Sequence, residues 1–509
     1  MMTDQIVTAK VSEICALIDE LLVSVDKAVE NQTPLHEIEE NVLRSVLEIG
    51  RNVLQRLFDT LGLGDVGEEF TLPGGRTLKR SKEPKTREYQ SVFGTFTLKR
   101  YVYSQREGQK AELIPLDAHL ALPEGKSSYL LQDFTQHLAM EVPFQQVSTI
   151  IGRILGVEQY VDSLERTNHK MSEHVGDFHL RQAAPPASEE GAIVVETADG
   201  KGVPIRRPPD ALPIEEHEHK SGPKPDRKKM ATLAGVYTID PYPRTPDQVV
   251  ESLFGDPQAE RSSSSERPRP RHKRVRGCLN LIDSDGEEIR ARAVMFGWMA
   301  DEVAARNPHG DKPVIAIMDG EESLWSELDT FQGSDNRVEI LDLLHVTPRL
   351  WKAARIFCGD DKEATQFVRQ RLRGILCGDV DGVIRGFQRM ASLRHLSGRS
   401  RSTIRAICGY FKKHRHRMRY DYYLAEGYPI ASGAIEGACR NVVKDRMERT
   451  GMNWVIRGAQ AMLTLRCVYL SDHWDEFFRT YFTAETQRLH PHRDLIRELS
   501  WATSWATAM

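Results

Sequence analysis

Apolar residues near the N-terminus recur at alternating spacings of four and three, the pattern of a helix that buries one stripe of its surface. The first stripe comprises Val7, Val11, Ile14, Ile18, Leu21, Val25 and Ala28. A second stripe runs from Ile38 to Leu57 and stops near Gly62. The two stripes predict a helical hairpin over residues 1–70, which either buries its own apolar residues or serves in dimerisation.

The next segment, residues 75–180, combines a strand pattern with a helical one. Alternation around Gly94 predicts a β-hairpin, whose Lys99 and Arg100 are candidates for contact with phosphate. Farther on, two helical stretches, 144–155 and 160–171, meet at Gly156 as in a helix-turn-helix unit. In such a unit the second helix enters the major groove, so residues 165–170 would face base edges, and plain helix packing is the alternative. The segment is therefore a candidate for binding DNA ends.

Short apolar runs alternate with helical patterns between about residues 190 and 347. The expected strands are 192–198, 230–239, 278–282, 314–318 and 338–344, with a helix at 290–306. Early strands follow one another closely and later ones are reached through helices, which predicts an α/β fold with a mixed sheet. A basic segment rich in serine and proline, residues 261–276, predicts a mobile loop.

The rest of the chain is expected to be mostly helical. Residues 348–429 predict a helical insertion, and residues 430–475 predict a return to the core with a last helical segment over 435–469 that carries Glu436. Residues 476–509 are expected to form a C-terminal tail.

Composition narrows the class of protein. The chain has 509 residues, of which 40% are hydrophobic and 28% charged, as in a globular protein of roughly three domains. It has no apolar run of membrane-spanning length and no secretory signal pattern, so we expect a cytoplasmic protein without a membrane partner. Its seven cysteines are scattered without a Cys-x-x-Cys pair, which argues against a disulfide framework and a zinc ribbon.

Charge is distributed unevenly along the chain. Residues 1–70 carry 14 acidic and 5 basic side chains, whereas residues 401–460 carry 12 basic and 5 acidic ones with aromatic residues between them. Such a basic and aromatic segment is typical of polyanion binding, and a solvated helix face is the alternative. The candidate contacts to the DNA backbone are Lys412, Lys413, Arg415, Arg417, Arg440, Lys444, Arg446 and Arg449. Trp454 and Tyr420 are candidates for stacking on an unpaired base.

Three acidic residues are the best candidates for chemistry. Asp199 lies in AIVVETADGKGVP and Asp319 in PVIAIMDGEESLW, each at the end of an apolar strand. Two carboxylates on neighbouring buried strands repel each other unless a divalent cation lies between them, although either aspartate alone suits a turn. Glu436 is flanked by small residues and followed by Arg440 and Lys444 on the same helical face; the alternative is a solvated Glu–Arg pair. Three acids suit two cations roughly 3.5 to 4 Å apart.

Four segments carry a resemblance to a known family: TADGKGVPIRR, AIMDGEESLW, LDLLHVTPRLWKAA and YPIASGAIEGACRNVVKDRMERTGMNW. They resemble, in the same order, the catalytic blocks of bacterial insertion-sequence DDE transposases, most closely the ISKra-type family, over about residues 75–470. The resemblance implies a ribonuclease H-like mixed sheet interrupted by a helical insertion, behind a mostly helical N-terminal region with a β-hairpin. It also implies that Asp199 lies on the first strand, Asp319 after the fourth, and Glu436 on a helix beyond the insertion.

The resemblance carries further expectations. Related Mutator-like transposases have a Cys or Asp, two residues and a His after the second aspartate, and Asp342-Leu343-Leu344-His345 matches this signature. His345 is therefore expected near the scissile phosphate. The zinc motif that many members carry near the N-terminus is missing from this sequence.

The implied partners and cofactors follow from the same family. The three acids would hold two Mg²⁺ ions, with Mn²⁺ as a possible substitute. The expected partners are the terminal repeats of the element, target DNA and further copies of the chain in a dimer or higher oligomer, in the cytoplasm at a bacterial nucleoid. A ribonuclease H-like nuclease without strand transfer and a catalytically silent DNA-binding derivative remain alternatives.

Overall fold

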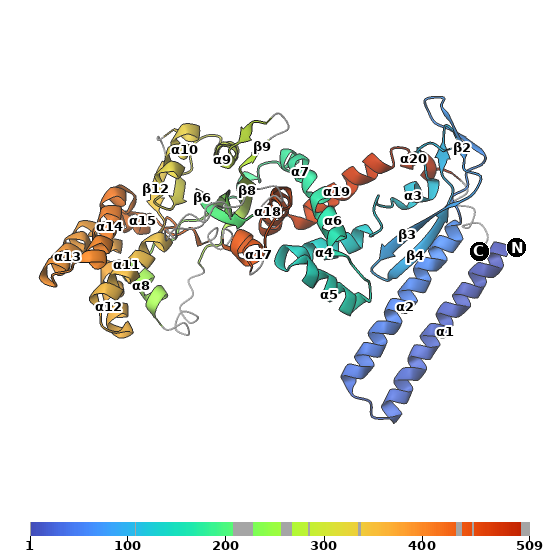
Figure 1. The fold of residues 1–509 in the computed structure, drawn as a ribbon, viewed down its shortest axis with the longest axis horizontal. Coiled ribbons are helices and arrows are strands. Elements are labelled where there is room, and N and C mark those ends of the chain that lie inside the picture. The colour runs from blue at the N-terminus through green and yellow to red at the C-terminus, as the bar shows by residue number, and fades with distance from the viewer. Residues whose placement is uncertain are drawn as a thin grey trace, which may run out of the picture. The chain divides into compact units, whose positions relative to one another are not determined.

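The structure is a computed structural model that describes residues 2–106, 108–206, 228–255, 267–282, 286–333, 337–433, 440–449 and 452–499. The chain divides into two compact units, the first formed by Met1–His174 with Asp475–Met509 and the second by Val175–Trp474. Figure 1 shows the elements of each unit. In the part of the chain that the structure describes, no helix has the length and apolar character needed to cross a bilayer.

The first unit begins with two helices, α1 (Met2–Glu30) and α2 (Leu35–Leu61), that pack along each other as a hairpin. This is the pairing that the two apolar stripes predict. Near its C-terminal end, α2 buries Phe58 against Tyr89 and Phe96. Many other apolar side chains of the hairpin stay exposed: Val11, Ile18, Leu22, Val29, Leu43, Val46, Val53 and Leu57. The hairpin therefore has more apolar surface than the contact between its own helices covers.

The predicted β-hairpin is confirmed: β3 (Lys85–Ser91) pairs antiparallel with β4 (Gly94–Arg100). Gly94 has a φ of 123°, which only glycine adopts readily. A second small sheet has the order β1 (Glu69–Thr71), β2 (Thr77–Arg80) and β5 (Tyr103–Ser104). The expected contact of Arg100 with phosphate is wrong. Its Nε lies 2.8 Å from Asp117, and its side chain is only 11% exposed.

Four helices follow: α3 (Pro115–Leu120), α4 (Tyr129–Glu141), α5 (Phe144–Leu155) and α6 (Val161–Glu173). The break between α5 and α6 falls at Gly156, as the helix-turn-helix pattern predicts. Two of the candidates for base contact on α6 already have partners within the protein. Asn168 is buried and donates to Gln136 at 3.0 Å, and Lys170 pairs with Glu485 at 2.5 Å.

The expected C-terminal tail is wrong, because the chain there forms α19 (Trp474–Leu489) and α20 (Arg493–Arg497) within the first unit. Tyr481 donates to Gln132 at 3.1 Å, and Ile496 belongs to a core cluster with Leu78. Aromatic residues at 477, 478 and 481 already have the three- and four-residue spacing of a buried helix face.

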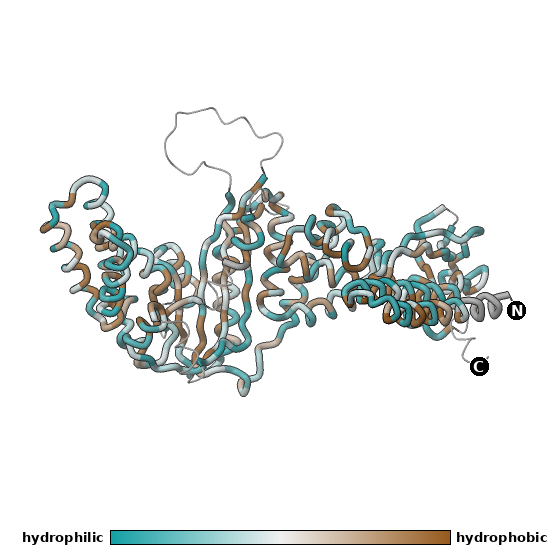
Figure 2. Tube along the Cα trace, turned by 90° about the horizontal axis from the view of Figure 1, so that it is seen from below, coloured by the Kyte–Doolittle hydropathy of each residue, from teal (hydrophilic) through white to brown (hydrophobic). Residues whose placement is uncertain are grey.

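The second unit is built on a five-stranded mixed sheet of order β12-β11-β6-β7-β8. Its strands are β6 (Ile193–Pro204), β7 (Lys228–Ile239), β8 (Arg271–Leu279), β11 (Val314–Met318) and β12 (Arg337–Leu341). Strands β6, β7 and β8 are antiparallel, whereas β11 runs parallel to both β6 and β12. The predicted mixed α/β architecture is therefore confirmed, and Figure 2 shows apolar stretches along the central strands.

The expected loop over 261–276 is wrong in its last part, where residues 271–276 belong to β8. Val275 pairs with Gly235 of β7, so this part of the chain belongs to the edge of the sheet. The basic side chains have partners on α9 (Ala291–Arg306): Arg274 pairs with Glu302 at 3.0 Å, and Arg276 lies 4.7 Å from the ring centroid of Trp298. Residues 261–266 lie outside the described residues.

Helices cover the sheet and position its strands. Helices α9 and α10 (Glu322–Gln332) share one core cluster with Val194, Ala198 and Met318. Helix α18 (Ile456–Leu470) packs on β8, where a Cβ on Gly277 would lie 3.0 Å from Leu463. The remaining short elements are α7 (Val175–Arg181), the 3₁₀ turn Ala187–Glu189, α8 (Pro246–Phe254), β9 (Leu281–Ile282) and β10 (Glu288–Ile289).

A group of helices follows β12, at the edge of the sheet (Figure 1). Its members are α11 (Leu343–Phe357), α12 (Asp361–Leu376), α13 (Val380–Leu393), α14 (Gly398–His414), the 3₁₀ turn Arg415–Arg417 and α15 (Tyr420–Ala425). Tyr420 anchors the group, because its buried hydroxyl donates to the Leu341 carbonyl at 2.6 Å.

The chain then returns to the sheet through a π-helical turn, Arg440–Lys444, and α17 (Asp445–Met447). The helical segment expected over 435–469 is interrupted, since residues 452–455, before α18, are not helical. Trp454 forms a strand-like bridge with Ile205, and its amide donates to the Pro204 carbonyl at 3.0 Å.

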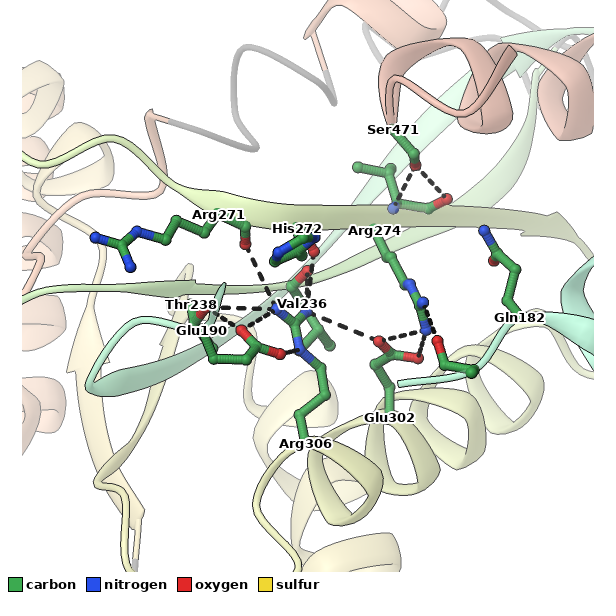
Figure 3. A network of polar contacts seen from close by, with 12 residues as sticks. Gln182, Glu190, Val236, Thr238, Arg271, His272, Arg274, Glu302, Arg306 and Ser471 are labelled. Carbon is green, nitrogen blue, oxygen red and sulfur yellow. Dashed lines mark hydrogen bonds and ion pairs between the residues drawn. The ribbon is translucent and has the colours of Figure 1, made fainter. Parts of the chain in front are cut away.

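Buried ion pairs fasten the sheet to α9 near the start of β6, as Figure 3 shows. Arg306 donates to Glu190 at 2.7 and 2.8 Å, and the two side chains are 0% and 2% exposed. Arg306 also donates to the His272 carbonyl at 3.0 Å, at the start of β8. These contacts join the segment before β6 to β8 and α9.

Candidate active site

Three aspartates occupy equivalent places on the three neighbouring parallel strands. Ala316 of β11 pairs with Glu196 of β6, so the same register continued by three residues sets Asp319 beside Asp199. Met318 pairs with Leu341 of β12, so the next pair along is Asp319 and Asp342. The carboxyl ends of β11 and β12 thus gather acids next to Asp199, although the residues come from distant parts of the chain.

Asp199 is held on β6 itself, opposite Leu233 of β7. Its side chain is 18% exposed, and its Oδ2 lies 3.0 Å from Nζ of Lys201, which is two residues farther on the same face of the strand. The ammonium group of Lys201 therefore lies against the carboxylate of Asp199.

Asp319 follows the last residue of β11 and begins a tight turn. Its Oδ1 accepts a hydrogen bond from the Glu321 amide at 2.7 Å, and its carbonyl accepts one from the Trp325 indole at 2.8 Å. Burial raises the pKa of Asp319, and the charge of Asp199 adds to this effect while His345 opposes it. Asp199 is thus close enough to Asp319 to influence the pKa of Asp319.

Asp342 is buried and caps the N-terminus of α11. It accepts hydrogen bonds from the Leu344 amide at 3.0 Å and from the Ser432 hydroxyl at 2.5 Å. Its Oδ2 also lies 3.5 Å from Nδ1 of His345. With these partners, Asp342 is an orienting group for His345 and not a free ligand.

His345 lies beside the acids with its side chain 28% exposed. Its pKa is raised, first by the hydrogen bond to Asp342 and then by the charges of Asp342, Asp319 and Asp199, against the effect of burial. The structure therefore brings His345, Asp199 and Asp319 together. A half-exposed imidazole of this kind can hold or release a proton next to a bound phosphate.

Glu436 lies outside the described residues, as do its neighbours at 434–439. Both flanks of this segment are placed. Ser432, before it, bonds to Asp342, and the π-helical turn Arg440–Lys444, after it, contacts β6. Within the described ranges, no three His, Cys, Asp or Glu side chains are grouped as metal ligands.

The basic candidates of α14 and the following turn separate into two kinds. Lys412, Lys413 and Arg415 are exposed. Arg417 is buried, and its expected role on the DNA backbone is wrong. Its Nε donates to Glu339 at 2.6 Å, and its Cζ lies 4.1 Å from the centroid of Trp325. This guanidinium holds β12 and α10 together.

The same division holds for the candidates after residue 440. Lys444 and Arg449 are exposed, and the side chain of Arg440 lies outside the description. Arg446 is 0% exposed and stacks on Trp454 at 5.2 Å, so it cannot follow a DNA backbone as expected. Trp454 also donates its indole N–H to the Met447 carbonyl at 3.1 Å.

Tyr420 was expected to stack on a base. It is fully buried beneath β12, with its hydroxyl bonded to Leu341, so this expectation is wrong.

Sequence reasoning missed two residues near these acids, Tyr410 on α14, which lies against Gly320, and Arg349 on α11, which lies against Tyr410 and His345. Arg349 follows His345 by four residues, which puts the two on one helix face, and this spacing could have drawn attention to it. Tyr410 gives no such signal, because its place depends on how α14 folds back on the sheet.

Comparisons with known proteins add little. No family model matches the chain, and no curated protein matches it in sequence. Among solved structures it is similar to the Drosophila P element transposase strand transfer complex, with a TM-score of 0.22 and 11% sequence identity. That alignment covers 78% of this chain and 94% of the other. A likeness with so low a TM-score carries no argument about fold or function.

Proposed function

We propose that the chain is a DDE transposase of a bacterial insertion sequence, of the ISKra type that its sequence resembles. It would cleave DNA at the ends of its element and join the freed 3′ ends to target DNA. The observation that carries the proposal is the proximity of Asp199 and Asp319. These residues are 120 positions apart in sequence (319 − 199), yet the charge of Asp199 acts on Asp319, and both acids act on His345.

The order of the strands supports a ribonuclease H-like fold. Of the five strands in the large sheet, β6 is the first in the chain and β11 is the fourth. Asp199 lies on the former and Asp319 directly follows the latter, which is the placement that the family implies. A group of helices follows β12, where the family implies an insertion before the third acid.

The residues present suit a magnesium site. Mg²⁺ prefers carboxylate oxygens, which Asp199 and Asp319 offer at one edge of the parallel strands. The proposed third ligand is Glu436, four residues after Ser432 and four before Arg440. Two bound Mg²⁺ or Mn²⁺ ions would activate the attacking oxygen and stabilise the leaving oxygen.

The chain's own groups would orient the DNA around these acids. Asp342 fixes the imidazole of His345, which would hold a proton beside the scissile phosphate. The exposed cations that remain as backbone contacts are Lys412, Lys413, Arg415, Lys444 and Arg449, with Arg440 as a further proposal. Residues 75–180 are proposed to bind the ends of the element.

Self-association is proposed through the helical hairpin. Exposed Val11, Ile18, Leu22 and Val29 recur at spacings of seven and four on α1, which is the seam of a coiled coil. A second copy of the same hairpin would cover this seam. Replacing Ile18 and Leu22 by serine is expected to lower the mass measured by light scattering in solution, and an unchanged mass would contradict the proposal.

The experiment uses duplexes taken from the DNA that flanks the gene. In Mg²⁺ the wild-type protein is expected to cleave these ends and to join a pre-cleaved end to a second duplex. Asp319→Asn and Asp199→Asn should each reduce cleavage by roughly a thousandfold or more while duplex binding is kept. Asp311→Asn, an exposed aspartate just before β11, is the matched control and should cleave normally.

Other outcomes decide between the alternatives. Cleavage without joining of the pre-cleaved end would identify a nuclease. Duplex binding without cleavage by the wild type would identify a silent DNA-binding derivative. Full activity of Asp319→Asn would overturn the proposed site.

A further inference from the structure

Tyr410 lies directly on the turn that carries Asp319. A Cβ on Gly320 would lie closer to the end of the Tyr410 side chain than real contacts allow, so a larger residue at position 320 would require Tyr410 to move. Burial raises the pKa of Tyr410 to about 12, so its phenol stays protonated at neutral pH. Helix α14, which starts 79 residues after Asp319 (398 − 319), thus packs on the acid-bearing turn itself.

Arg349 lies against the face of the same ring. Its Cζ is 3.5 Å from the Tyr410 centroid, a close cation–π contact, and its Nη1 donates to the carbonyl of His345. The side chain is half-buried, and among the described residues no carboxylate forms an ion pair with it. Its charge is therefore oriented by the fold, and no acid in the part of the chain that the structure describes neutralises it.

The positive charge of Arg349 would offset the negative charge of the nearby acids. Asp199, Asp319 and Asp342 concentrate negative charge where a DNA phosphate would have to approach. Repulsion between these carboxylates and a phosphate is strong in a half-buried site, and without bound metal it opposes binding of the strand. A guanidinium with free N–H groups offers a phosphate two parallel hydrogen bonds.

We propose that Arg349 binds a phosphate of the DNA backbone at this site and that Tyr410 positions its guanidinium there. The inference rests on the proposed function and deepens it. It assigns part of the DNA site to two helices, α11 and α14, that carry none of the three acids. Arg349 touches the substrate, whereas Tyr410 acts through Arg349 and through the Asp319 turn.

The test compares cleavage of two kinds of duplex end. One is the natural end from the flanking DNA; the others each carry one uncharged methylphosphonate at a chosen position around the cut. On the natural end, Arg349→Gln is expected to cleave roughly a hundredfold more slowly, and Arg349→Lys should recover part of the rate because it keeps the charge. Arg355→Gln, an exposed arginine later on α11, is the matched control and should cleave at the wild-type rate.

The methylphosphonate series separates a phosphate contact from a structural defect. At one position the wild-type rate should fall by about the same factor as the Arg349→Gln rate on the natural end, and Arg349→Gln should lose nothing further there. At every other position the losses should multiply. Multiplied losses at all positions, or a normal rate for Arg349→Gln, would overturn the inference.

The positioning role of Tyr410 is tested with variants that keep or remove its aromatic ring. Tyr410→Phe keeps the cation–π contact and should cleave within about threefold of the wild type, whereas Tyr410→Leu should resemble Arg349→Gln on the whole series. Equal defects in Tyr410→Phe and Tyr410→Leu would overturn the positioning role of the ring.

Failure of the inference and failure of the proposed function are distinguishable. Cleavage by wild type that is lost in Asp319→Asn supports the function whatever Arg349 does. If no end is cleaved at all, duplex affinity still tests Arg349, because its replacement should lower the salt dependence of binding by about one phosphate contact. An unchanged salt slope would then count against the inference.

Discussion

Two acidic residues, Glu190 just before β6 and Asp199 within it, have opposite surroundings. Before the strand, Glu190 is 2% exposed, and its two oxygens accept hydrogen bonds from Arg306, with Thr238 as a further donor (Figure 3). Farther along the strand, Asp199 is 18% exposed, has Lys201 at 3.0 Å and feels a second carboxylate, Asp319. The charge of Glu190 is balanced inside the protein by Arg306, whereas the charge of Asp199 and its neighbour Asp319 is not fully balanced.

This difference separates acids that hold the fold together from acids that are available for chemistry. For Glu190, burial raises the pKa, but the bonds to Arg306 and Thr238 outweigh it, so the net pKa is lowered and the ionised form is stabilised. For Asp319, burial prevails and the pKa is raised. Acids of the second kind lower the stability of the empty site and recover that cost only when a cation binds.

The largest expected effect comes from removing the cation of the matched pair. Arg306→Met leaves Glu190 buried without its counterion, so the free energy of unfolding should fall by about 3–5 kcal/mol. Denaturant unfolding measures this. Arg292→Met, near the start of the same helix, breaks a partly exposed pair with Glu321 and should cost no more than about 1 kcal/mol. Similar losses in the two variants would mean that burial does not set the strength of these pairs.

Glu196 extends the comparison to a third carboxylate, which lies on β6 and faces the core. It is fully buried, and its oxygen accepts one bond from Gln332 at 2.6 Å. Burial raises its pKa from 4.5 to about 7. Below pH 4.5 the group is neutral in both states; between 4.5 and 7 only the unfolded chain ionises, so stability is lost as the pH rises.

Glu196→Gln removes this pH dependence. The variant should be more stable than the wild type at pH 8 by up to about 3 kcal/mol, and the difference should vanish near pH 4. Thermal or denaturant unfolding at the two pH values measures it. Glu426→Gln, at an exposed position, should show no such difference. Equal stability of Glu196→Gln and wild type at pH 8 would show that Glu196 is solvated or paired in solution.

The elements that rest on local patterns could be predicted from the sequence. The strand before Asp319 and the first part of β6 are mostly apolar runs, which is enough to identify a buried strand. The turn expected at Asp199 is wrong, because β6 continues through Asp199 and Gly200 to Pro204. The hairpin around Gly94 and the break at Gly156 depend on single glycines with positive φ.

The role of each charged residue could not be predicted in the same way. Arg417 is held by Glu339, which is 78 residues away in sequence, and Arg446 stacks on Trp454 beyond the end of its own helix. A count of local charge does not reveal such partners. Likewise, the charge of residues 271–276 predicts a loop, although these residues belong to β8 and Arg274 and Arg276 have their partners on α9.

Metal binding directly tests Asp199 and Asp319, the acids whose charges the protein does not fully balance. If Asp199 and Asp319 hold Mg²⁺, adding the ion at a hundred times its dissociation constant should raise the free energy of unfolding by about 2.7 kcal/mol. EDTA should reverse the gain. Asp319→Asn should be at least as stable as the wild type without metal and should gain little on adding it. The same Mg²⁺ gain in Asp319→Asn and wild type would place the ion elsewhere.

The smallest expected effect extends the comparison from acids to cations. Lys412 is exposed and Arg417 is buried against Glu339, although the two lie five residues apart in the same basic cluster. If Lys412 contacts DNA, Lys412→Gln should reduce the slope of log affinity against log salt by about 0.9, the value for one phosphate, with little change in stability. Arg417→Gln should leave the slope unchanged and lower the melting temperature, because it leaves Glu339 with only Arg337 as a partner. Titrations of duplex binding at several salt concentrations measure both slopes. A reduced slope for Arg417→Gln, with none for Lys412→Gln, would mean that burial in the free protein does not tell a structural cation from a DNA-binding one.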